Sequence, residues 1–334
     1  MRGSALVRPG PRRVAVAAGA ALACLAMPVP AHAQTHSSME GVQWLLTATG
    51  IAHGLTQGAA VFLAGLAAFA VLVWLPESRS PSHREAELAR PLVLGGWSLF
   101  GLLLVAGTVD LALYALRASG ESFGLALFGE ALFETRTGSI WLARTGLGLV
   151  AAGLLARAAR SGRRGYWMGA IVAGGGVLAT LSLQSHAAAE GGILPLFSNW
   201  LHVVAGSVWM GGLLGFPLLL LGPLRKPASE RAALLRSVVR RFSRVATAAV
   251  LVLVATGVHA VLLNVPDAAT LISTPYGRAL VMKLGLFVLL LAAGGINLID
   301  RGSGPFGRMV GAELVLAFGI FLAAGFLTVL PPSG

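Results

Sequence analysis

Eight long apolar segments constrain the fold of this chain more than any other feature. They cover approximately residues 42–75, 91–117, 138–160, 166–188, 194–224, 236–264, 276–300 and 310–330. A helix needs about 20 residues to cross the ~30 Å apolar layer of a bilayer, and each segment has that length. Only 11% of the 334 residues are charged, whereas soluble domains carry about 25%. The sequence therefore predicts an all-α membrane protein with eight transmembrane helices.

Charged residues between the segments predict the orientation. Arginines gather in the loops after the first, third, fifth and seventh segments, whereas the other loops carry Glu121, Glu130, Glu134, Glu190 and Asp267. Since cytoplasmic loops retain positive charge, the basic loops are expected inside and both mature termini outside. The formal net charge of +12 does not indicate nucleic-acid binding, because a basic groove with interleaved aromatics is absent. The expected surroundings are membrane lipid.

The first 33 residues have the pattern of a cleavable signal peptide. Arg12 and Arg13 precede an apolar stretch over 14–27, and residues 31–33 fit the A-x-A cleavage pattern. An uncleaved anchor helix is the alternative. The one cysteine, Cys24, lies in this segment, so the mature chain is expected to lack disulfides, iron–sulfur clusters and thiolate metal sites.

The two halves of the chain align as an internal repeat. The aligned polar positions follow in the same order: His53 with His202, Asp110 with His259, and Arg144 with Lys283. Four helices in each repeat predict halves of equal orientation, related by an axis along the membrane normal. The expected division places the first three helices in residues 34–165 and the other five in a core over residues 166–330.

Four histidines are expected near the outer ends of these helices: His53, His186, His202 and His259. His186 is expected to end the fourth helix. Ionisable side chains in a membrane indicate function by default, and imidazole is the commonest metal ligand among side chains. These histidines therefore form a candidate metal site. The alternative is that each one only hydrogen-bonds a neighbouring helix.

Three further residues are candidate ligands. Asp110 can supply a carboxylate to the same site, and Met210 a thioether, although core packing is the favoured explanation of Met210. Cleavage after residue 33 would make His36 the third residue of the mature chain. A histidine there, with a free amine and two amides, can form a square-planar Cu(II) site, unless Gln34 cyclises and removes the amine.

The stretch 199–212, NWLHVVAGSVWMGG, resembles the signature helix of the copper resistance protein D family. The segments 186–189, 256–259 and 274–283 fit that family as well, and the resemblance covers approximately residues 166–300. It implies a bacterial inner-membrane protein, not an enzyme, that moves Cu(I) or Cu(II) from periplasm to cytoplasm. A periplasmic copper chaperone is an implied partner.

Two other functions are compatible with the same histidines. His202 and His259, on consecutive antiparallel helices, suit the two axial ligands of a b-type haem in a membrane oxidoreductase. A factor that delivers copper to a respiratory oxidase would use the site without net import. No G-x-x-x-x-G-K-[ST] motif is present, so an ATP-driven pump is not expected.

Overall fold

The computed structural model describes residues 36–77, 81–119, 124–189, 191–221, 228–299 and 306–331. Every regular element in these ranges is helical. The elements are α2 (His36–Phe69), η1 (Ala70–Trp74), α3 (Leu75–Glu77), α4 (Pro81–Ser119), α5 (Leu125–Glu134), α6 (Arg136–Ser161), α7 (Arg164–Ser182), α8 (His186–Ala189), α9 (Ile193–Leu221), α10 (Ala228–Asn264), α11 (Thr270–Ser273), α12 (Pro275–Ile299) and α13 (Phe306–Val329). The predicted signal peptide lies outside the described residues.

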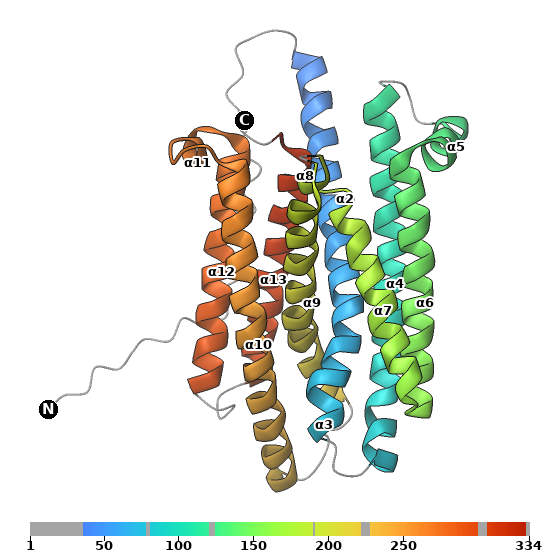
Figure 1. Ribbon diagram of the computed structural model, residues 1–334, viewed down its shortest axis with the longest axis vertical. Coiled ribbons are helices and arrows are strands. Elements are labelled where there is room, and N and C mark those ends of the chain that lie inside the picture. The colour runs from blue at the N-terminus through green and yellow to red at the C-terminus, as the bar shows by residue number, and fades with distance from the viewer. Residues whose placement is uncertain are drawn as a thin grey trace, which may run out of the picture.

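Eight helical stretches in the described ranges are long and apolar enough to cross a membrane. They are α2 with η1, and α4, α6, α7, α9, α10, α12 and α13. This confirms the predicted number of spans, and the protein is a multi-pass membrane protein. The short helices α5, α8 and α11 lie between spans at one end of the bundle, the upper end in Figure 1.

Helix α2 is the centre of the bundle. It packs against α4, α7, α9 and α13, and 72% of its most apolar stretch is buried, against 17% for α10. In Figure 1, α4, α6 and α7 lie on one side of the α2–α9 pair, and α10 and α12 lie on the other. The first helices of the two predicted repeats are thus neighbours, whereas the repeat itself stays a prediction.

Glycines allow the central helices to touch backbone to backbone. A Cβ atom added at Gly211 of α9 would lie 2.1 Å from the carbonyl oxygen of Gly65 on α2. A Cβ atom added at Gly325 of α13 would lie equally close, 2.1 Å, to the carbonyl oxygen of Gly50. Small residues at such crossings are a usual means of helix association in membranes. They fix α2 against both α9 and α13.

The α2 span changes from α-helix to π-helix over Ala70–Trp74, at the end of the bundle opposite α5, α8 and α11. The carbonyl oxygen of Leu72, inside this segment, accepts a hydrogen bond from Nε of Arg241 on α10 at 2.6 Å. Short π-helical segments often occur at functional positions. Here the segment joins the central helix to the basic end of α10.

The expectation that His186 ends the fourth helix is wrong. Helix α7 ends at Ser182, and the hydroxyl of Ser185 donates a hydrogen bond to the Ser182 carbonyl at 2.7 Å. Serine hydroxyls compete with the helical backbone bonds in this way. His186 instead begins the short helix α8.

Candidate metal-binding site

His53 of α2 contacts Asp110 of α4 inside the bundle. Its Nδ1 lies 2.9 Å from Oδ2 of Asp110, and only 9% of His53 is exposed. Because an ionised carboxylate only accepts hydrogen bonds, Nδ1 is the donor, and in a neutral imidazole Nε2 then keeps its lone pair. Metal-binding histidines are commonly oriented by a carboxylate in this way.

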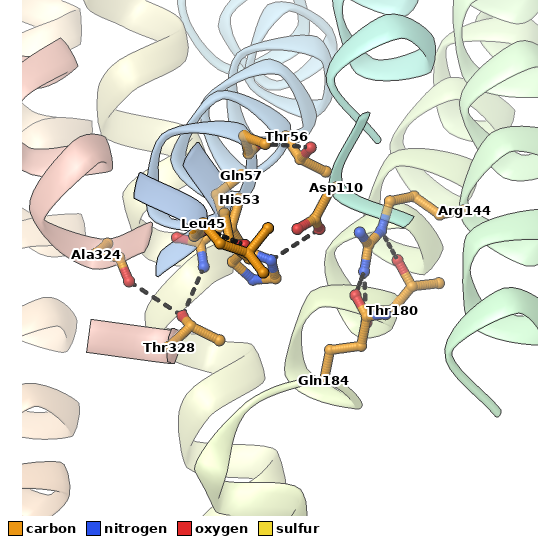
Figure 2. Close-up of polar contacts among 12 residues, drawn as sticks. Leu45, His53, Thr56, Gln57, Asp110, Arg144, Thr180, Gln184, Ala324 and Thr328 are labelled. Carbon is orange, nitrogen blue, oxygen red and sulfur yellow. Dashed lines mark hydrogen bonds and ion pairs between the residues drawn. The ribbon is translucent and has the colours of Figure 1, made fainter. Parts of the chain in front are cut away.

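A buried arginine extends this contact to two more helices. Arg144 of α6 is 3% exposed. Its Nε donates to Oγ1 of Thr180 at 2.9 Å, and a terminal nitrogen donates to the Thr180 carbonyl at 3.0 Å and to Oε1 of Gln184. Figure 2 shows the Asp110 carboxylate between the His53 ring and the Arg144 guanidinium. Arg144 is thus bound to Thr180 of α7 and to Gln184 just after α7, and it attracts Asp110 electrostatically.

His186 is held at the same end of the bundle by the backbone of α13. Its Nε2 lies 3.0 Å from the carbonyl oxygen of Leu327. A carbonyl only accepts, so Nε2 is the donor, and in a neutral imidazole Nδ1 then keeps its lone pair. The ring also meets Tyr276 edge to face, with 6.2 Å between the centroids.

A cavity of about 350 Å³ is lined by several of the predicted metal ligands. His53, Asp110 and His186 all contribute to its lining, together with Arg117 and Arg136. The cavity lies where α2, α4, α6, α8 and the end of α13 meet. This places three of the predicted ligands around one accessible space.

His202 and His259 occupy a different place, the interface of α9 and α10. Nδ1 of His202 lies 2.9 Å from Oγ1 of Thr256, and the Thr256 hydroxyl lies 2.7 Å from the Val252 carbonyl. The single hydroxyl proton serves that carbonyl, so Thr256 accepts from His202 and Nε2 of His202 keeps its lone pair.

His259 lies one helical turn nearer than His202 to the end of the bundle that carries α8 and α11. Its Nδ1 is 3.0 Å from Oγ of Ser198. Ser198 precedes His202 by four residues on α9, and His259 follows Thr256 by three on the antiparallel α10. The two histidines therefore stand on successive turns of the same helix pair.

The structure does not gather the four histidines around one ion. Within the described ranges, no three His, Cys, Asp or Glu side chains are grouped so that they could hold one metal. The histidines instead form two pairs, one at the cavity and one between α9 and α10. A copper site here would need ligands from the cargo, water or other donor types.

Two further candidates have different positions. Met210 is 4% exposed and packs within the hydrophobic core, which agrees with the packing interpretation. His36 is the first residue of α2, but its side chain lies outside the described part, so the N-terminal Cu(II) site stays a prediction.

Several polar residues of the interior were not expected from the sequence. Glu313 of α13 is 2% exposed. It is the one carboxylate in the sequence of the eighth apolar segment, and a carboxylate at such a position indicates a functional residue. Thr180, Thr256 and Ser198 orient charged or aromatic partners. Single hydroxyl side chains are too common in membrane helices for their partners to be found from sequence.

Comparisons with known proteins agree on one family. The family model described as "Copper resistance protein D" matches residues 236–327. A second family model, "Copper resistance protein D-like, N-terminal domain", matches residues 43–196. The stretch 199–212 lies between the two matched ranges. The predicted boundary between residues 165 and 166 stays a prediction.

Two curated relatives have similar sequences. "Copper transport protein CutJ" of Bacillus subtilis (strain 168) is 30% identical over 262 residues, which are 76% of this chain and 48% of that protein. "Copper resistance protein D" of Pseudomonas syringae pv. tomato is 30% identical over 215 residues, 62% of this chain and 68% of that protein. The chain thus spans about half the length of the Bacillus relative. No solved structure matches.

Proposed function

Since this chain belongs to the copper resistance protein D family, we propose that it takes copper from the periplasmic side of a bacterial inner membrane toward the cytoplasm. Both ends of the described bundle, the start of α2 and the end of α13, lie at the end that carries α5, α8 and α11 (Figure 1). In the proposed orientation this end is periplasmic, and the arginine-rich ends of α6 and α10 are cytoplasmic.

The observation that carries the proposal is the orientation of the histidine rings. His53, His186 and His202 each place one ring nitrogen against an acceptor, which leaves the other nitrogen with a free lone pair. A neutral imidazole with one oriented nitrogen is the form that binds copper. Histidines that only hydrogen-bond a neighbouring helix would make the same contacts, so the copper content of histidine variants separates the two interpretations.

The two histidine pairs suit successive stations for a passing ion. The cavity with His53 and His186 is accessible from the outer end, and His202 lies between α9 and α10, one turn further inward than His259. The ion would bind first at the cavity and then at the α9–α10 interface. Without a nucleotide-binding motif in the sequence, the movement would follow the gradient of copper or of a coupled ion.

Metal content and the visible spectrum test the proposal. The full chain would be purified, loaded with copper and compared with His53→Ala and His202→Ala, with His83→Ala at the opposite end of α4 as the control. We expect each of the first two changes to lower bound copper, because each removes an oriented nitrogen, and His83→Ala to leave it unchanged. Equal copper in all variants would contradict the assignment of these histidines.

The same samples separate the alternative functions. A Soret band in the purified protein would support the b-type haem oxidoreductase instead. Uptake of copper into vesicles that contain the protein would support import. Copper binding without uptake would favour delivery to a respiratory oxidase, and added periplasmic copper chaperone would then test the expected donor.

A further inference from the structure

Two guanidinium groups stand at the cavity that holds His53 and His186. Arg117 lies in the last turn of α4, and Arg136 is the first residue of α6. Both are exposed. Among the described residues neither forms an ion pair, and Arg136 donates one hydrogen bond, to the Leu183 carbonyl at 3.3 Å. Most of their donors are free for a ligand.

The charge of the cavity does not suit a bare metal ion. Its charged lining consists of Arg117, Arg136 and Asp110, and the single carboxylate is already bound to His53. Arg144 adds a further positive charge beside Asp110. Two exposed cations at the entrance repel a free copper cation.

We propose that the cavity takes copper as a complex with a small carboxylate-bearing ligand of net negative charge, an inference that rests on the proposed function. Guanidinium groups bind carboxylates through paired hydrogen bonds. Arg117 and Arg136 hold the carboxylates of the ligand, while the free nitrogens of His53 and His186 face the metal. The ligand supplies the donors that the two histidines lack.

The size and lining of the cavity favour a small molecule over a protein segment. Its volume of about 350 Å³ lies in the usual range for small-molecule sites. Thr137, Gln184 and Ser185 add neutral hydrogen-bonding groups beside the two arginines. A phosphate of an anionic lipid also accepts hydrogen bonds from guanidinium and hydroxyl groups, but it offers nothing that the lone pairs of His53 and His186 could bind.

Competition between two forms of copper tests the proposal. The full chain in nanodiscs of neutral phosphatidylcholine would be titrated with Cu(II) citrate and with aquo Cu(II). The double variant Arg117→Gln/Arg136→Gln is compared with Arg160→Gln, an exposed arginine at the other end of α6. We expect the double variant to bind Cu(II) citrate about a hundredfold more weakly than the unchanged chain does, the size of two lost charge-assisted contacts at about tenfold each. Its affinity for aquo Cu(II) should stay equal or rise.

A second double variant separates binding from folding. Arg117→Lys/Arg136→Lys retains the charge and loses the paired geometry, so it should lie between the unchanged chain and the glutamine variant. Equal loss of both copper forms in the glutamine variant, or no loss of either, would overturn the inference. An effect of the arginines that disappears when phosphatidylglycerol is added would identify a lipid headgroup as the occupant and overturn it as well.

Failure of this inference is distinguishable from failure of the proposed function. If aquo Cu(II) binds and its binding depends on His53, but citrate and the arginines have no effect, only the anionic complex is wrong. If neither form of copper binds to the unchanged chain, the proposed function itself is contradicted.

Discussion

Replacing Gly211 with alanine should pull the two central helices apart. The added Cβ atom would lie 2.1 Å from the Gly65 carbonyl oxygen and 2.4 Å from the Gly65 Cα, whereas ordinary contact begins at 3.4 Å. Because both neighbours are backbone atoms, no side chain can move away. Helices α2 and α9 must separate by about 1.3 Å, the difference between 3.4 and 2.1 Å.

The expected loss of stability follows from two opposing effects. Overpacking costs about 1–3 kcal/mol, and a contact between two rigid backbones belongs at the upper end. Alanine gains about 1 kcal/mol over glycine in helix propensity. The net expectation for Gly211→Ala is a loss of about 2 kcal/mol in the free energy of unfolding.

Thermal unfolding in detergent, followed by tryptophan fluorescence, measures this loss. The matched control is Gly206→Ala on the same helix, where the nearest atom to an added Cβ, Cδ2 of Leu253, would be 3.8 Å away. This control should keep or raise the midpoint, since it gains propensity without a clash. A Gly211→Ala protein as stable as Gly206→Ala would refute the backbone contact between α2 and α9.

Three further substitutions test single contacts. Thr256→Val removes the acceptor that orients His202 and should weaken copper binding about tenfold or more, whereas Thr256→Ser should restore it in equilibrium dialysis. Thr180→Val leaves the Nε of the buried α6 arginine without an acceptor, and chemical denaturation should show a loss of about 1–3 kcal/mol. Hydrogen bonds from the side chain and backbone of Thr270 lower the pKa of Asp267 between α10 and α11, so Thr270→Val should raise that pKa toward its ordinary value in an NMR titration. Because the folded pKa is the lower one, the stabilisation is complete above pH ~3.9 and is lost as pH falls through the folded value; an unchanged pKa in Thr270→Val would contradict the assignment.

The number of spans and several of their limits could be predicted from the sequence. Apolar length and loop charge placed eight spans, and the start of α9 at Ile193 and the end of α10 at Asn264 fall within a residue of the expected limits. Helix ends that carry polar residues were harder to predict. Helix α4 begins at Pro81, well before the expected residue 91, because its first turns are too polar to register as membrane-spanning.

The partners of the histidines could not be predicted in the same way. Hydropathy predicts where along a membrane span a residue lies. The side chains that the residue contacts depend on where the helices cross. The Gly65–Gly211 contact sets one such crossing. His53 therefore faces Asp110 across α2 and α4, whereas its expected counterpart His202 faces Thr256. A shared four-histidine site was inferred from depth alone, and depth does not determine which face a side chain occupies.

The π-helical segment Ala70–Trp74 divides α2 into two parts with different helical phase. A π-turn holds one residue more than an α-turn, so each position after it is rotated by about 100° relative to a continuous α-helix. Loss of one codon within the segment would restore that phase, shift α3 around the helix axis and remove the bond between Leu72 and Arg241. His53 and Gly65, which precede the segment, would keep their places. The contacts that follow the π-helical segment can therefore change by single insertions or deletions, while the part of α2 that carries His53 and Gly65 keeps its contacts.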